Sequence, residues 1–217
     1  MFTQSEENYL KAIFHLQQDV DGGVSTSSIS ELLQTKAASV TEMVKKLADK
    51  KLVHYQKYYG VHLTESGRAH ALTIVRKHRL WECFLVDRLN FNWDEVHEVA
   101  EQLEHIKSAK LVEELDKFLE HPLYDPHGDP IPDADGNLPK RFKKKLSELK
   151  TGEQGVCKGF KDDSSAFLKF LAKQDIGLGT AIKVLNIEAF DESVTALADQ
   201  KEISLSKTAT NNIYVGN

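Results

Sequence analysis

The sequence predicts a mainly α-helical protein with a small β-rich module at its C-terminal end. Apolar residues recur at helical spacing through most of the N-terminal half. All five prolines fall within residues 122 to 139, and this stretch cannot be helix or central strand because proline fixes φ and has no N–H donor. After it, β-branched residues gather between Gly, Asp and Asn turns, in AIKVLNI, KEISLS and NNIYV.

The composition is that of a folded protein. The chain has 217 residues, of which 41% are hydrophobic and 28% charged, enough for one large domain or two to three small ones. No apolar run approaches the roughly 18 residues of a membrane helix, and the start has no basic region followed by an apolar one, so we expect a cytoplasmic protein. Cys83 and Cys157 are too isolated for a disulfide framework or a cysteine zinc site. A net charge of −5 argues against indiscriminate coating of nucleic acid.

The N-terminal part predicts three helices and a hairpin. Apolar residues between Tyr9 and Leu16 give an amphipathic first helix. SISE, 28 to 31, has capping-box spacing and opens a short helix that ends near Gln34. A second short helix covers 38 to 50, and LVHYQKYYGVHLT, 52 to 64, predicts a two-stranded hairpin. This order is that of a winged helix-turn-helix, whose second short helix enters the major groove of DNA.

Side chains of this region suit contacts with double-stranded DNA. Small or polar groups that begin the 38–50 helix can meet base edges, and lysines and hydroxyls nearby can contact phosphates. The predicted DNA-binding residues are Thr26, Ser28, Lys36, Ala38, Ser39, Thr41, Glu42, Lys45, Lys46, Lys57 and Tyr59. The alternative is that the lysines form a solvated helix face, and that the domain binds a protein.

Helices continue beyond the hairpin. Thr64 caps a long helix that runs to about Leu89, a further helix covers 94 to 106, and another starts at Ser108. The Pro-rich segment then ends the helical part. DADGN, 133 to 137, resembles a calcium loop, but its Gly is misplaced and the closing Glu is missing, so we expect a turn.

Two of these helices carry side chains that can bind metal. HEVAEQLEH, 97 to 105, places four such residues within an arc of roughly 100° on one helix face. RKHRLWE, 76 to 82, adds an imidazole and a carboxylate one turn apart on the long helix. A single His–Glu pair is more often a surface pair, but coincidences on two helices favour a nitrogen/oxygen cage. The candidate ligands are His78, Glu82, His97, Glu101, Glu104 and His105.

Enzyme motifs fit this cluster poorly. HEVAE lacks the second His of H-E-x-x-H, and EQLEH lacks the first His of H-x-x-E-H. The E-x-x-H repeat of di-iron bundles is also absent, because Gln102 stands three residues before His105. We therefore expect a binding protein rather than an enzyme. Mixed His and carboxylate ligands suit Mn²⁺ or Fe²⁺, while Zn²⁺ competes by raw affinity.

The chain resembles the metal-dependent repressors of the diphtheria toxin repressor family, and most of all their manganese-responsive branch. The resemblance rests on ENYLKAIFHL (7–16), SVTEMVKKLADKKLVHY (39–55), LTESGR (63–68), RKHRLWE, HEVAEQLEH and PHGDPIP (126–132). It implies a winged helix-turn-helix domain over 1–72, a helical dimerisation and metal-binding domain with the Pro-rich linker over 73–140, and an SH3-like β-barrel domain over 141–217.

The resemblance also implies two metal positions. His78, Glu82 and His97 belong to one, which Asp163 of the C-terminal module is expected to complete, with Asp162 as the alternative. Glu101, Glu104 and His105 belong to the other, with a side chain from the first helix. Glu101 stands where iron-type members carry a cysteine, and a hard carboxylate in place of a soft thiolate favours Mn²⁺.

The first helix departs from the family pattern. Asn8 stands where manganese-type members carry an Asp, and Asn offers only a neutral carbonyl. Lys11 stands where some of them carry a Glu, and a cation there cannot ligate a metal ion. We therefore expect the second position to be weak and a coupled pair of manganese ions to be disfavoured.

The resemblance implies a homodimeric repressor of metal-uptake genes, with the metal ion as corepressor and a pseudo-palindromic DNA operator as partner. No membrane and no small organic substrate is expected. Three alternatives remain: a winged-helix regulator that senses a non-metal ligand, a metal-dependent enzyme that uses the same cage, and an interaction protein whose lysine face binds an acidic partner.

Overall fold

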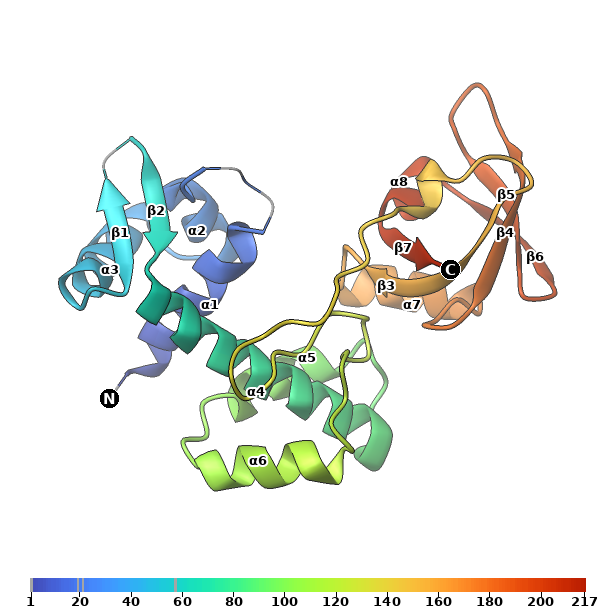
Figure 1. Cartoon of the computed structure of the whole chain (residues 1–217). Coiled ribbons are helices and arrows are strands. Elements are labelled where there is room, and N and C mark those ends of the chain that lie inside the picture. The colour runs from blue at the N-terminus through green and yellow to red at the C-terminus, as the bar shows by residue number, and fades with distance from the viewer. Residues whose placement is uncertain (1, 19, 21, 57) are drawn as a thin grey trace. The chain divides into compact units, whose positions relative to one another are not determined.

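The chain folds into two compact units, each with parts from several segments. Figure 1 labels their helices and strands. The computed structural model describes residues 2–18, 20, 22–56 and 58–217. Unit 1 contains residues 1–78, 101–109 and 132–137. Unit 2 contains residues 79–100, 110–131 and 138–217. Within the described residues, no helix is long and apolar enough to cross a membrane.

Unit 1 is built on three helices and a hairpin, as the sequence predicts. They are α1 (Gln4–Leu16), α2 (Thr26–Leu32), α3 (Ala37–Asp49), β1 (Val53–Gln56) and β2 (Gly60–Leu63). α1 packs against α2, α3 and β2, and the two strands pair antiparallel. Fully buried Leu10, Ile13, Ile29, Val44 and Leu47 join the three helices. This arrangement is a winged helix-turn-helix.

The predicted start of the first short helix was wrong. α2 begins at Thr26, and its N-cap is Ser25, whose side chain accepts the N–H of Ser28 at 2.9 Å. The SISE spacing therefore lies inside the helix. A serine in extended conformation three residues earlier already satisfies the free N–H of the first turn, so Ser28 is not needed as the cap.

α4 (Glu65–Leu89) follows the hairpin directly. Thr64 precedes it, and the Thr64 hydroxyl accepts the N–H of Gly67 at 3.0 Å. Gly67 allows close packing on the hairpin, because a Cβ there would lie 1.9 Å from the carbonyl oxygen of Leu52. α5 (Val96–Leu103) and α6 (Ala109–Phe118) complete the helical part. Both units take residues from α4 and from α5.

The Pro-rich segment forms turns held by aspartates. The Asp125 carboxylate accepts the N–H groups of His127 at 2.8 Å and of Asp129 at 3.0 Å. Gly128 has φ 86°, and a Cβ there would meet the Lys158 carbonyl oxygen at 2.2 Å. The Asp133 carboxylate accepts the N–H groups of Asp135 and Asn137, so the predicted turn at DADGN is confirmed.

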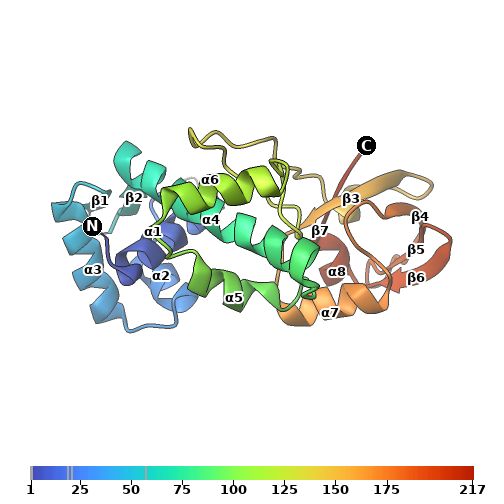
Figure 2. The same cartoon turned by 90° about the horizontal axis from the view of Figure 1, so that it is seen from below.

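The C-terminal module is a five-stranded antiparallel sheet with strand order β6-β5-β4-β3-β7. The helices α7 and α8 lie beside it (Figure 2), and apolar residues of both join its core. The three predicted strand segments are present, whereas β3 and β5 were not foreseen. The elements are η1 (Leu146–Glu148), β3 (Gln154–Phe160), α7 (Ser165–Lys173), β4 (Ala181–Ile187), β5 (Val194–Ala198), β6 (Lys201–Leu205), α8 (Lys207–Asn211) and β7 (Ile213–Gly216).

Candidate metal centres and nucleic-acid interface

One face of α3 is buried and the opposite face is exposed. Val40, Val44 and Leu47 point into the core. The exposed residues of the helix include Ala38, Ser39, Glu42, Lys45 and Lys46, all of them predicted DNA contacts. Thr41 is half-buried, and its hydroxyl donates to the Ala37 carbonyl oxygen at 3.0 Å. The position of α3 after α2 is that of a recognition helix.

The predicted DNA-binding residues outside α3 differ in their exposure to solvent. Thr26 and Ser28 are half-buried in α2, and Lys36 is exposed as the N-cap residue of α3. Tyr59 is 70% exposed near the tip of the hairpin, and Tyr58 is 92% exposed. Lys57 lies outside the described residues.

Two lysines at the C-terminal end of α3 form ion pairs with the buried carboxylate of Glu6. Lys46 Nζ lies 3.0 Å and Lys50 Nζ 2.7 Å from Glu6 Oε1, and the Glu6 side chain is fully buried. Burial alone would raise the pKa of Glu6, but hydrogen bonds from Lys50 and Lys46 outweigh it and lower that pKa to about 2. Among the described residues, Lys45 forms no such ion pair with a carboxylate, so it is the better candidate for a phosphate contact.

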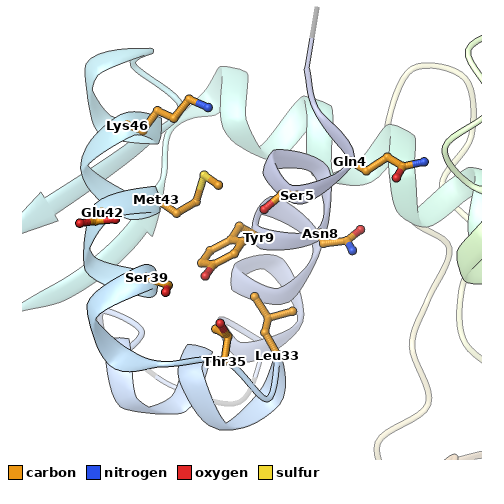
Figure 3. A pocket seen from close by; sticks show the side chains of 10 residues that line it. All are labelled: Gln4, Ser5, Asn8, Tyr9, Leu33, Thr35, Ser39, Glu42, Met43 and Lys46. Carbon is orange, nitrogen blue, oxygen red and sulfur yellow. The ribbon is translucent and has the colours of Figure 1, made fainter.

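A hollow of about 640 Å³ lies between α1 and the α2–α3 pair (Figure 3). Tyr9 and Met43 point into the space between α1 and α3, whereas Asn8 points away from α3. Ser39, Glu42 and Lys46 of the recognition helix line the same hollow. It therefore opens on the surface that is predicted to face DNA.

Unit 2 contains a buried cluster of two carboxylates and an imidazole. Glu82 of α4 and Asp125 and His127 of the Pro-rich segment are all buried, and each offers one ligand atom within 4.8 Å of the others. His127 Nδ1 lies 3.8 Å from Glu82 Oε2. His97 Nδ1 lies 3.5 Å from Glu82 Oε1, and the ligand atoms of His78, Glu82 and His97 all lie within 4.8 Å of one another, so the three predicted ligands of the first position come together. Glu82 is the centre of this arrangement.

The charges of this cluster favour a bound cation. Burial, together with the nearby carboxylates of Glu82 and Asp129, raises the pKa of Asp125 to about 7. Arg79 offsets part of this charge, because its Nε lies 3.3 Å from Asp125 and its Nη2 3.1 Å from Asp129. Like carboxylates held together in the interior are costly unless a cation compensates them.

A backbone carbonyl sets the tautomer of His127. His127 Nε2 lies 2.8 Å from the Trp93 carbonyl oxygen, an acceptor only, so Nε2 carries the proton and donates. Nδ1, the ring atom on the Glu82 side, then carries the lone pair that a metal ion needs when the ring is neutral. Burial would lower the pKa of His127, but the carboxylates of Glu82 and Asp125 outweigh it and raise that pKa.

Sequence reasoning missed Asp125 and His127 as ligands. His127 lies in PHGDPIP, one of the segments that carry the family resemblance, and Asp125 directly precedes that segment. A histidine between Pro126 and Pro130 could have indicated a metal ligand. Asp163 is exposed, and its charge contributes to the raised pKa of His127. Asp163 is not in a ligand group of three among the described residues.

The remaining predicted ligands lie in unit 1. His78 Nδ1 is 2.5 Å from Glu104 Oε2, and His105 Nδ1 is 2.6 Å from Glu7 Oε2. Both Glu104 oxygens also lie close to Lys11 Nζ, at 2.7 and 2.8 Å, and Glu101 lies 3.5 Å from it. Among the described residues, Glu101, Glu104 and His105 do not form a group of three ligand atoms within 4.8 Å.

A winged helix-turn-helix joined to buried carboxylate and imidazole groups defines a class of protein, the DNA-binding regulators that respond to a metal ion. Family models match along almost the whole chain. They are the iron-dependent repressor N-terminal DNA-binding domain over residues 1–61, the iron-dependent repressor metal-binding and dimerisation domain over 64–133, and the FeoA domain over 144–217. The chain belongs to the family of iron- and manganese-dependent transcriptional repressors.

Relatives in this family match to different extents. The iron-dependent repressor IdeR of Mycobacterium bovis is 36% identical over 128 residues, which are 58% of this chain and 54% of that protein. The chain thus matches about half the length of this curated relative. An uncharacterised HTH-type transcriptional regulator of Methanocaldococcus jannaschii is 36% identical over 118 residues, 54% of this chain and 94% of that protein.

Solved structures match over nearly the full length. A manganese-dependent transcriptional repressor in complex with manganese has a TM-score of 0.88 at 36% identity, and the match covers 97% of this chain and 98% of that one. The manganese regulator SloR has a TM-score of 0.79 at 35% identity, with 99% of both chains covered. The fold and the family of the whole chain follow from these matches.

Proposed function

We propose that this protein is a manganese-responsive transcriptional repressor that acts in the cytoplasm. A homodimer would bind a pseudo-palindromic operator in double-stranded DNA when Mn²⁺ is bound, and would repress genes of metal uptake. Membership of the repressor family supports this proposal, as does the similarity to a manganese-dependent repressor. The exposed face of α3 supplies the surface for DNA.

The cluster around Glu82 is the observation that carries the choice of metal. Its donors are carboxylate oxygens and imidazole nitrogens, which suit Mn²⁺, with Fe²⁺ as the alternative. Neither cysteine is suited to supply a thiolate ligand, because burial raises the pKa of the Cys83 thiol well above its usual range and that of the Cys157 thiol to about 12. Zn²⁺ would compete in vitro by raw affinity.

Glu82, Asp125 and His127 would hold the ion, and His97 would add a ligand from α5. His78 lies one turn before Glu82 on α4, which supports its predicted place at the same position. The ion would supply a double positive charge that compensates the two buried carboxylates. The protein supplies orientation, since Asp125 accepts two N–H groups of its own turn and Trp93 fixes the tautomer of His127.

The proposal requires linkage between metal and DNA. If Mn²⁺ favours the arrangement of the dimer that fits successive major grooves, Mn²⁺ raises the affinity for DNA and DNA raises the affinity for Mn²⁺ by the same factor. A metal ion that binds equally well to both arrangements would change nothing.

The test is fluorescence anisotropy on DNA from the protein's own upstream region, or on DNA selected from a randomised pool. The protein is titrated at one salt concentration with chelator, Mn²⁺, anaerobic Fe²⁺ and Zn²⁺. We expect Mn²⁺ to tighten binding ten-fold or more, a coupling of about 1.4 kcal/mol. Glu82→Gln should abolish the effect, while Asp87→Asn, which removes an exposed carboxylate from the same helix, should keep it.

Three outcomes separate the alternatives. Equal DNA binding with chelator and with metal would contradict the metal response and favour a regulator of a non-metal ligand. Binding without preference among DNA sequences would favour an interaction protein. Turnover in a hydrolase or oxidase screen would favour an enzyme.

A further inference from the structure

The ammonium group of Lys11 lies where the sequence predicts the second metal position. Lys11 belongs to α1, and its side chain is only 11% exposed. Its Nζ lies 2.7 Å from Glu104 Oε1, 2.8 Å from Glu104 Oε2 and 3.5 Å from Glu101 Oε1. Lysine is rarely buried unless it is paired, and here the pairing is with the two carboxylates that were expected to bind the ion.

The other predicted donors of this position are engaged as well. Glu104 Oε2 also lies 2.5 Å from His78 Nδ1, and the Glu104 side chain is fully buried. His105 Nδ1 lies 2.6 Å from Glu7 Oε2. A divalent ion would have to break these contacts, and it would leave a buried ammonium group without its partner.

The local charge leaves little attraction for a further cation. Lys77 is buried in the same unit, and the charges of Glu7 and Glu104 act on its ammonium group. Two lysines thus already compensate part of the negative charge of this region. Asn8 adds no charge. Its Oδ1 and Glu104 Oε1 are both buried without a hydrogen-bond partner among the described residues, and the ion pair with Lys11 Nζ at 2.7 Å compensates the charge of Glu104 Oε1.

We propose that the Lys11 ammonium group replaces the second metal ion, so that the chain binds one regulatory Mn²⁺, at the Glu82 position. The contact between α1 and the C-terminal end of α5 would then be permanent, made by Lys11 with Glu101 of α5 and with Glu104 directly after it, rather than dependent on a second ion. This inference rests on the proposed manganese response. It assigns Lys11 a positioning role and leaves control by metal to Glu82 and its neighbours.

The number of bound Mn²⁺ ions tests the inference. Free Mn²⁺ is measured by electron paramagnetic resonance while the full-length chain, stripped of metal, is titrated with MnCl₂. We expect one Mn²⁺ per wild-type chain. Lys11→Met removes the charge and keeps the side chain long and apolar, so Glu104 loses its partner and a second Mn²⁺ should bind.

Control variants separate charge from structure. Lys11→Arg keeps the cation and should bind one Mn²⁺. Lys110→Met removes an exposed lysine from α6 and should also bind one. The pair Glu82→Gln and Glu82→Gln/Lys11→Met isolates the second position, with no tight Mn²⁺ expected in the first variant and one in the second. Circular dichroism checks the fold, and Lys11→Gln replaces Lys11→Met if the latter does not fold.

The outcomes distinguish this inference from the proposed function. Two Mn²⁺ ions on the wild-type chain would overturn the role of Lys11 and leave the manganese response intact. A folded Lys11→Met or Lys11→Gln protein that still binds only one Mn²⁺ would also overturn it. A wild-type chain that binds no Mn²⁺ would overturn both.

Discussion

Substitution of Arg79 should show most clearly how strongly the buried carboxylates around Glu82 depend on a compensating cation. The Arg79 side chain is 7% exposed, and it faces the carboxylates of Asp125 and Asp129 and donates to the Pro130 carbonyl oxygen at 2.5 Å. Arg79→Met keeps much of the apolar stem but leaves both carboxylates without this partner. Removing one side of a buried ion pair costs about 3–5 kcal/mol.

We expect a loss near the lower end of that range, about 3 kcal/mol of unfolding free energy at pH 8. Asp129 keeps 25% exposure and a second partner, Arg141 Nη2 at 3.3 Å, and Asp125 keeps its two N–H bonds. The loss should depend on pH. Because the pKa of folded Asp125 is already about 7, this carboxyl group is largely neutral at pH 5.5 and needs Arg79 less there.

The sign of this dependence follows from proton binding. A carboxyl group whose folded pKa is raised binds protons more strongly in the folded state, so its stabilising effect is present at low pH and is lost as pH rises through 7. The loss in Arg79→Met should therefore be smaller at pH 5.5 than at pH 8 by at least about 1 kcal/mol.

The assay is urea unfolding with chelator present, followed by tryptophan fluorescence. The chain has two tryptophans, Trp81 and Trp93, and both lie in unit 2 with Arg79, so the signal reports the right part of the molecule. Arg88→Met is the control, since Arg88 is exposed and its guanidinium group lies over the Phe118 ring, 5.1 Å from its centroid. A loss below about 1 kcal/mol at pH 8, or one of equal size at both pH values, would refute the reasoning.

Further predictions concern unit 1. Glu6→Gln should lower the free energy of unfolding by about 1 kcal/mol at pH 7, a modest loss because Lys46 and Lys50 are partly exposed. The loss should shrink toward pH 3, because the stabilisation that comes from the lowered pKa of Glu6 disappears as the pH falls toward that pKa. Thermal unfolding followed by circular dichroism at both pH values measures this. Lys45→Ala should lower the slope of log affinity against log salt by about 1 in DNA titrations, and more than Lys46→Ala, because Lys46 pairs with Glu6. Gly67→Ala should cost about 2–3 kcal/mol in urea unfolding, because its Cβ meets the Leu52 carbonyl oxygen. Unchanged thermal stability of Glu6→Gln, an unchanged salt slope of Lys45→Ala, or an unchanged urea midpoint of Gly67→Ala would contradict the respective prediction.

The parts of the fold that follow local pattern were predicted well. α1, α3, the hairpin and α4 agree with the sequence because apolar spacing, β-branched residues and the Thr64 cap each act within a few residues. β3 escaped notice since QGVCKGF carries two glycines and one lysine, and its strand conformation depends on pairing with β4 and β7. Tertiary pairing outweighs local preference there.

The metal site was predicted only in part, because some of its residues meet through tertiary folding rather than through local sequence pattern. The pairing of His97 with Glu82 follows from helix faces that the sequence displays. Asp125 and His127 reach Glu82 only because a turn without regular periodicity folds back, and no spacing rule describes that path. Likewise, Lys11 was read as a residue unable to ligate, but its contact with Glu104 depends on how α1 packs in unit 1.

The most direct test of the account is the affinity for Mn²⁺ measured with and without DNA. The full-length protein is titrated with MnCl₂ alone and in the presence of saturating operator DNA, and free Mn²⁺ is followed by electron paramagnetic resonance. We expect DNA to raise the Mn²⁺ affinity by the same factor, ten-fold or more, by which Mn²⁺ raises the DNA affinity, since linkage is reciprocal. An Mn²⁺ affinity that is the same with and without DNA would contradict it.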